Sequence, residues 1–114
     1  MHFDIHKHNV ILTPQIEKLI ARKVAKLDKR LKTYHPDVAR LELQLRRHTD
    51  RTNQQVECAL TLHAFDDTLH AQKDADELRE AVDHTFDAML RELEHYRARV
   101  NKSLHPKLAK AEQP

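Results

Sequence analysis

Five basic side chains recur three or four residues apart and are the first candidates for chemistry. On a helical wheel they form one stripe, opposite the apolar residues that centre near Leu27: Lys18, Arg22, Lys26, Lys29 and Lys32. Ammonium and guanidinium groups in such a row suit the binding of successive phosphates. Like charges at this spacing also repel one another in an isolated helix. The pattern leaves two interpretations, a solvated helix face and a surface that follows a phosphate backbone.

Histidines are the second candidate group, because ten of the 114 residues are histidine. Polar and apolar residues alternate in the first segment, which places His2, His6 and His8 with Asp4 on one side of a strand. Imidazole is a common metal ligand, but side chains two apart on a strand are about 6–7 Å from each other. We favour a surface without bound metal and keep a His-rich metal-binding or protein-interaction module as the alternative.

The remaining reactive groups do not form a catalytic constellation. Cys58, the only cysteine, falls in the inward register of an alternating strand and is expected to be a core residue. The chain has no glycine, which excludes a Walker loop and a dinucleotide-binding glycine fingerprint. No serine-centred nucleophile motif occurs. We therefore predict no enzymatic activity, no cofactor and no small-molecule substrate.

The basic stripe must be positioned by a helix, and the flanking residues predict one. Residues 2–8 alternate as a half-buried strand. Thr13 is suited to cap a helix, and Pro14 to occupy its first position. The apolar spacing predicts a helix over residues 14–31. The pair His35-Pro36 marks the exit, because the residue before a proline avoids the helical region.

Three further strands follow. Residues 38–47 and 55–64 alternate and are separated by a polar hairpin loop at 48–53. Residues 65–67 are typical of a short turn, and Leu69 and Ala71 mark a short fourth strand. These features predict two antiparallel hairpins.

A second long helix closes the predicted domain. Asp74, followed three residues later by Glu77, resembles a capping box, and the apolar stripe continues to about Arg99. Residues 101–114 are basic with little apolar periodicity, and they are predicted to be a flexible tail after a domain over residues 1–100.

The order β-α-β-β-β-α predicts a two-layer α+β domain. A helical crossover makes the first two strands parallel, and the hairpins make the others antiparallel. Each strand alternates and each helix has one apolar stripe, so both helices are expected on one face of a four-stranded mixed sheet.

The net charge of +2 conceals a polarised chain. Residues 1–35 carry +5, residues 66–96 carry −7 and residues 97–114 carry +4. No apolar run is long enough for a membrane span, and no secretion signal is visible. We expect a cytoplasmic protein whose first helix and C-terminal end lead any contact with nucleic acid.

Several ordered fragments resemble one known family. Residues 9–14 (Asn-Val-Ile-Leu-Thr-Pro) and 23–29 (Lys-Val-Ala-Lys-Leu-Asp-Lys) look like the start of the ribosome hibernation promoting factor / protein Y family. Residues 69–71, 81–83 and the exit Arg-Ala-Arg at 97–99 are similar to its second half. The resemblance covers residues 1–99 and is to a short form of the family.

The resemblance implies a fold similar to a double-stranded-RNA-binding domain and a non-enzymatic stress factor. Such a factor binds the 30S ribosomal subunit and its 16S rRNA in the mRNA and tRNA channel, and it inhibits translation in idle ribosomes. The isolated protein is expected to be a monomer. Both promotion and prevention of ribosome dimerisation are compatible with the sequence.

The resemblance also implies which side chains contact rRNA. Together with the basic stripe, it gives nine candidates: Lys18, Arg22, Lys23, Lys26, Lys29, Arg30, Arg91, Arg97 and Arg99. The chain departs from the family pattern at Arg79, where an aromatic residue is usual, and at Ala88, Glu94 and His95, where basic residues are usual.

Overall fold

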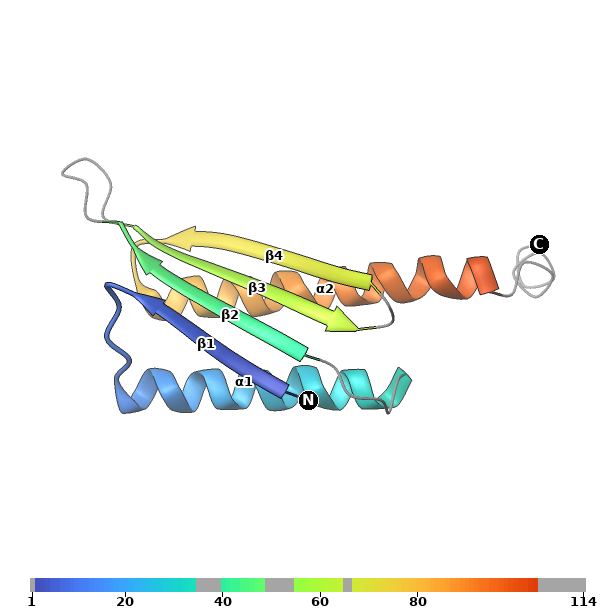
Figure 1. Ribbon diagram of the computed structural model, residues 1–114, viewed down its shortest axis with the longest axis horizontal. Coiled ribbons are helices and arrows are strands. Elements are labelled where there is room, and N and C mark those ends of the chain that lie inside the picture. The colour runs from blue at the N-terminus through green and yellow to red at the C-terminus, as the bar shows by residue number, and fades with distance from the viewer. Residues whose placement is uncertain (1, 35–39, 49–54, 65–66, 105–114) are drawn as a thin grey trace.

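The computed structural model describes residues 2–34, 40–48, 55–64 and 67–104. Six elements follow the predicted order (Figure 1): β1 (His2–His8), α1 (Pro14–Tyr34), β2 (Arg40–Arg47), β3 (Val56–Ala64), β4 (Asp67–Ala75) and α2 (Leu78–Leu104). The predicted α+β class is confirmed.

The four strands form one mixed sheet in the order β1-β2-β3-β4. β1 pairs with β2 in parallel, whereas β3 is antiparallel to both β2 and β4. The register places Leu43 opposite Ile5 on one side and Leu60 on the other, so the apolar positions of neighbouring strands share one face. This confirms the predicted crossover and hairpins.

Both helices pack on that apolar face and run in the same direction (Figure 1). The core lies between the layers, where Leu27 of α1 and Phe86 and Met89 of α2 meet the buried leucines of the sheet. Burial of each such side chain stabilises the fold by roughly 1.5–3 kcal/mol. The sheet's other face carries the polar positions.

The connection from β1 to α1 uses two local devices. Asn9 has a φ of 55°, a left-handed conformation that asparagine tolerates better than most residues in a chain without glycine. The Thr13 hydroxyl then accepts a hydrogen bond from the Ile16 N–H at 3.3 Å, and its carbonyl accepts one from the Glu17 N–H at 3.0 Å. The predicted cap is confirmed, with Pro14 as the first residue of α1.

Both helices are longer than their apolar stripes predicted. α1 continues to Tyr34 and α2 to Leu104. Once a helix is nucleated, each added residue gains a hydrogen bond, so the helix passes its last apolar contact. Proline is the stronger stop signal, and Pro36 and Pro106 each follow within two residues.

The fourth strand is also longer than predicted, and the capping box is wrong. Asp74 lies in β4 opposite Glu57, because β4 pairs with the whole of β3. The cap position of α2 is Glu77, whose carbonyl accepts a hydrogen bond from the Ala81 N–H at 3.0 Å. Asp67, predicted in the turn, is instead the first residue of β4. The predicted loop at 49–53, the other turn residues 65–66 and most of the predicted tail lie outside the described residues.

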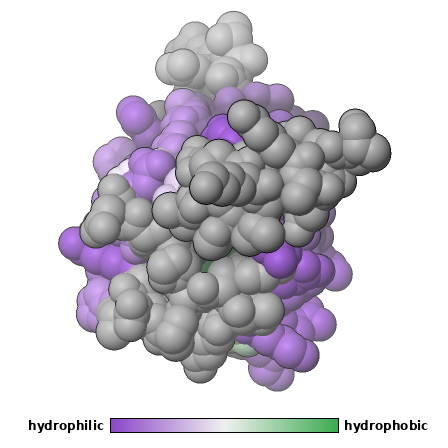
Figure 2. Space-filling view, turned by 90° about the vertical axis from the view of Figure 1, so that its right-hand side faces the viewer, coloured by the Kyte–Doolittle hydropathy of each residue, from purple (hydrophilic) through white to green (hydrophobic). Residues whose placement is uncertain are grey.

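No helix in the described ranges is long and apolar enough to cross a membrane. Figure 2 views the molecule from the end at which α1 and α2 finish, and the described surface visible there is mostly hydrophilic.

Candidate nucleic-acid interface

α1 has four sides with different surroundings. Its inner side buries Ile20, Leu27 and Leu31 in the core. One flank faces α2, and the opposite flank faces β1. The outer side faces solvent, and the candidate cations are divided between it and the α2 flank.

The flank toward α2 is electrostatically compensated, and we call it the seam. Lys23 Nζ lies 2.9 Å from Asp83 Oδ1 and 3.9 Å from Asp87 Oδ1. Arg30 Nη1 donates a hydrogen bond to Glu94 Oε1 at 3.2 Å. Two of the nine candidates are thus occupied in joining the helices.

The outer side carries the basic stripe, and from here the name refers to its four described side chains, all exposed: Lys18, Arg22, Lys26 and Lys29. Within the described ranges no carboxylate lies within ion-pair distance of Lys18, Arg22 or Lys26. The side chain of Lys32 lies outside the described residues. These four residues span about 16 Å of helix, at 1.5 Å per residue, and Lys18, Arg22 and Lys26 keep their charges available for a ligand.

The second-helix candidates lie in the C-terminal half of α2. Arg91, Arg97 and Arg99 are all exposed. The guanidinium of Arg99 lies 5.9 Å from the centroid of the Tyr96 ring, at cation–π distance. The first half of α2 instead presents Asp83 and Asp87 to α1, so the larger basic surface belongs to α1.

The histidines of β1 lie on the outer sheet face, as predicted, but they do not converge. His2 Nε2 is 3.5 Å from Asp4 Oδ1, whereas His6 and His8 are exposed opposite Gln44 and Arg46. In the described part of the chain no three His, Cys, Asp or Glu side chains are grouped to hold a metal ion. The described residues therefore give the metal-binding alternative no support.

The outer sheet face is instead a network of paired polar groups. His63 Nε2 lies 3.6 Å from Glu42 Oε2, and Arg40 Nη2 lies 2.8 Å from Glu42 Oε1. The His70 ring shares a hydrogen bond of 3.2 Å with Thr61. Because its charges are largely matched, this face is a weaker candidate for phosphate than the basic stripe.

Cys58 is fully buried in β3, which confirms the predicted core role. Burial raises the pKa of its thiol from 9.0 to about 11, despite a side-chain hydrogen bond with Thr85 that lowers it. The thiol is therefore uncharged at neutral pH and is a poor nucleophile.

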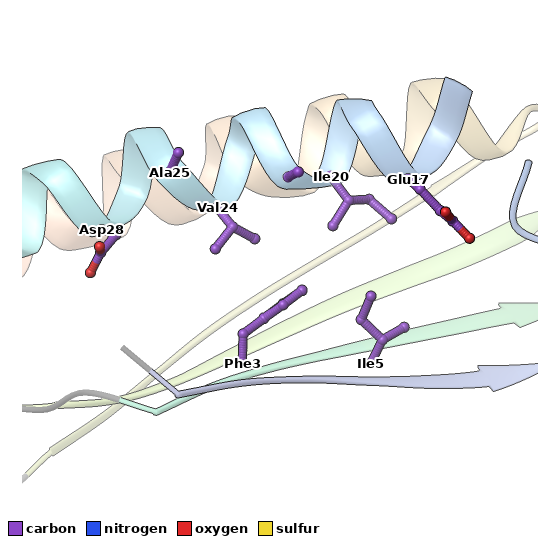
Figure 3. Close-up of a pocket in the computed structure, with 8 residues that line it drawn as sticks. Phe3, Ile5, Glu17, Ile20, Val24, Ala25 and Asp28 are labelled. Carbon is purple, nitrogen blue, oxygen red and sulfur yellow. The ribbon is translucent and has the colours of Figure 1, made fainter. Parts of the chain in front are cut away.

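Two hollows flank α1, and sequence reasoning missed both. One, of about 370 Å³, lies between α1 and β1, where Phe3 and Ile5 point toward Ile20 and Val24 (Figure 3). The other, of about 720 Å³, lies at the start of α1 and is lined in part by Lys18, Arg22 and Arg79. The sequence marked Arg79 only as a departure from the family's usual aromatic residue, and it lies one helical turn before Asp83.

Comparisons with known proteins agree on one family and one fold. The model of the Sigma 54 modulation protein / S30EA ribosomal protein family matches residues 3–101. No curated protein matches the chain.

Two solved structures are similar in fold. A ribosomal subunit interface protein from Coxiella burnetii has a TM-score of 0.69 at 16% identity, covering 86% of this chain and 99% of that one. The N-terminal domain of Protein Y from Thermus thermophilus has a TM-score of 0.67 at 14% identity, covering 84% and 99%. At these identities the likeness shows the α+β fold.

Proposed function

The chain belongs to the Sigma 54 modulation protein / S30EA ribosomal protein family, and from this premise we propose that it binds the small ribosomal subunit through 16S rRNA. It occupies the mRNA and tRNA channel there and inhibits translation in idle ribosomes. The basic stripe carries this proposal, because Lys18, Arg22 and Lys26 have no counter-charge among the residues that the structure describes.

The stripe is suited to RNA because its cations follow one another along one side of a helix. Each lysine or arginine that neutralises a phosphate releases condensed counterions, so several contacts in series produce a strong dependence on salt. Arg22 adds a planar guanidinium that engages a phosphate through two hydrogen bonds. α1 is held by a buried apolar face, so the stripe is ordered before it meets RNA.

Inhibition follows from occupancy rather than from catalysis. A domain seated in the mRNA and tRNA channel excludes both by volume. Arg91, Arg97 and Arg99 contribute a second contact along α2. The working form is a cytoplasmic monomer that becomes associated with ribosomes, and it requires no cofactor.

Co-sedimentation with purified 30S subunits tests the proposal. Wild-type protein should pellet with the subunits at low salt and be released progressively as salt rises over about 50–200 mM. The variant Lys26→Glu/Lys29→Glu should stay in the supernatant while keeping its circular dichroism spectrum. Failure of the wild-type protein to pellet at low salt contradicts the proposal.

A matched control separates position from net charge. The variant Arg46→Glu/Lys73→Glu makes the same change in net charge at two exposed positions away from α1. It should pellet nearly as well as the wild type. Equal losses in both variants would show that only overall charge matters and would remove α1 from the interface.

A further inference from the structure

At the first turn of α2, the sign of the charge that this helix presents to α1 changes. Arg79, Asp83, Asp87 and Glu94 follow one flank of α2 at helical spacing. At Asp83 and Glu94 this flank meets cations of α1, about 60 residues earlier in the chain. One turn before Asp83 the same flank carries the cation Arg79. At this point α2 therefore offers no negative charge to the cations of α1.

Arg79 lines the larger hollow together with Lys18 and Arg22 from α1. Three cations from two helices thus surround one space, and no carboxylate of the described residues lines it. The nearest acid along the flank, Asp83, is taken up by Lys23 at 2.9 Å. Glu17, in the first turn of α1, lines the apolar groove on the opposite flank (Figure 3).

Such a cluster costs stability unless an anion occupies it, because like charges repel in the absence of a counter-charge. The two helices also run in the same direction and begin at the same end of the molecule (Figure 1). The positive ends of both helix dipoles therefore lie at this end. The side-chain amide of Gln15, which also lines the hollow, adds hydrogen-bond donors.

We propose that Arg79, Lys18 and Arg22 form a phosphate-binding site that holds one backbone phosphate of the rRNA. This rests on the proposed function and adds to it a contact from the start of α2. The site binds phosphate oxygens through the forked donors of two arginines, with Lys18 as a point charge. Arg79 is thereby a binding residue.

Titration of full-length protein against 30S subunits at several salt concentrations tests the site. Arg79→Gln should weaken binding about fivefold at low salt and reduce the slope of log K against log salt by about one. Arg79→Lys should recover most of the affinity. Arg46→Gln, which removes an exposed arginine from the outer sheet face, should match the wild type.

A melting experiment separates a binding role from a structural one. Without RNA and at low salt, Arg79→Gln should raise Tm by about 1–2 °C, because it relieves repulsion among the three cations. A fall in Tm together with the loss of binding would mean that Arg79 only supports the fold, and it would overturn the proposal.

The remaining outcomes distinguish this inference from the proposed function. If wild-type protein binds 30S subunits and Arg79→Gln binds equally well, the site is overturned while the proposed function stands. If wild type does not bind, the proposed function fails and the rRNA assignment fails with it. A third outcome is that inorganic phosphate stabilises the wild type but not Arg79→Gln, while both proteins bind the subunits equally well. This result would identify a site for a free anion and overturn the RNA assignment.

Discussion

Lysine and arginine meet two different environments on neighbouring sides of α1. On the seam, Lys23 and Arg30 lie at 2.9 Å and 3.2 Å from carboxylates of α2. On the basic stripe, one residue away from Lys23, Arg22 has no carboxylate within that reach among the described residues. The residue types are the same, but their surroundings differ.

The difference shows that counter-charge, more than basic residues alone, identifies a binding surface. A cation already paired must give up its partner before it binds a phosphate, whereas an unpaired one gains the whole interaction. The seam is accordingly expected to govern stability and the stripe to govern RNA affinity. Each of the following variants tests that division of roles.

The largest effect should come from the inner side of α1, which anchors the helix that carries both regions. Leu27 is 1% exposed at the centre of the inner side of α1. Leu27→Ala should lower the free energy of unfolding by about 2–5 kcal/mol, because it removes buried methyl groups and leaves a cavity. Urea denaturation measures this loss.

In this variant, unfolding of α1 should disrupt the stripe and the seam together. At temperatures where Leu27→Ala is partly unfolded, its binding to 30S subunits should fall in proportion to the unfolded fraction. Full binding by a largely unfolded variant would mean that the stripe acts without an ordered α1, and the comparison would lose its basis.

A pair of neutralised lysines should separate the two regions most sharply. Lys26→Gln on the stripe should weaken 30S binding about fivefold and reduce the salt slope by about one, with Tm unchanged or raised. Lys23→Gln on the seam should lower Tm and leave the affinity within about twofold. The titrations and melts are made on both variants under the same buffer conditions.

The reverse pattern would contradict the division. If Lys23→Gln lost affinity without losing stability, the seam would open on binding and its cation would turn toward RNA. The resemblance that placed Lys23 among the rRNA contacts would then hold for this chain.

The sequence predicted the fold well because the alternation in the strands and the apolar spacing in the helices indicated the same two-layer arrangement. Alternation in residues 38–47 and 55–64 placed Leu43 and Leu60 inward, and both are fully buried. The apolar stripes of the helices then had one sheet face to cover. The ends of elements were less predictable, since Asp74 resembles a helix cap but continues β4 by pairing with β3.

The candidate site could be predicted only in part, because it depends on how two helices align. A helical wheel separates Lys26 from Leu27, but it does not show that Lys23 meets Asp83 rather than solvent. That contact is set by the relative position of α1 and α2 along their axes. The same alignment places Arg79 and Lys18 around one hollow. Along the sequence these two residues belong to segments of opposite net charge, residues 66–96 and 1–35.

A double-mutant cycle should measure the stronger seam contact. Lys23 is 22% and Asp83 38% exposed, so water screens the pair only in part. The coupling free energy from Lys23→Ala, Asp83→Ala and the double variant should be about 0.5–1 kcal/mol in urea denaturation. The charge-swapped variant Lys23→Asp/Asp83→Lys should retain most of it. A coupling indistinguishable from zero would show that apolar packing alone joins the helices.

The weaker seam contact, between Arg30 and Glu94, should have the smallest effect on stability. Arg30 and Glu94 are 49% and 61% exposed, so solvent competes for both groups. Their coupling should be only about 0.2–0.5 kcal/mol and should vanish near 1 M salt, where the Debye length is about 3 Å. Because this pair is held weakly, Arg30 is also the seam residue that RNA could recruit most easily. Arg30→Gln should therefore reduce 30S affinity more than Lys23→Gln does, and an equal or smaller reduction would confine the contacts of α1 to the stripe.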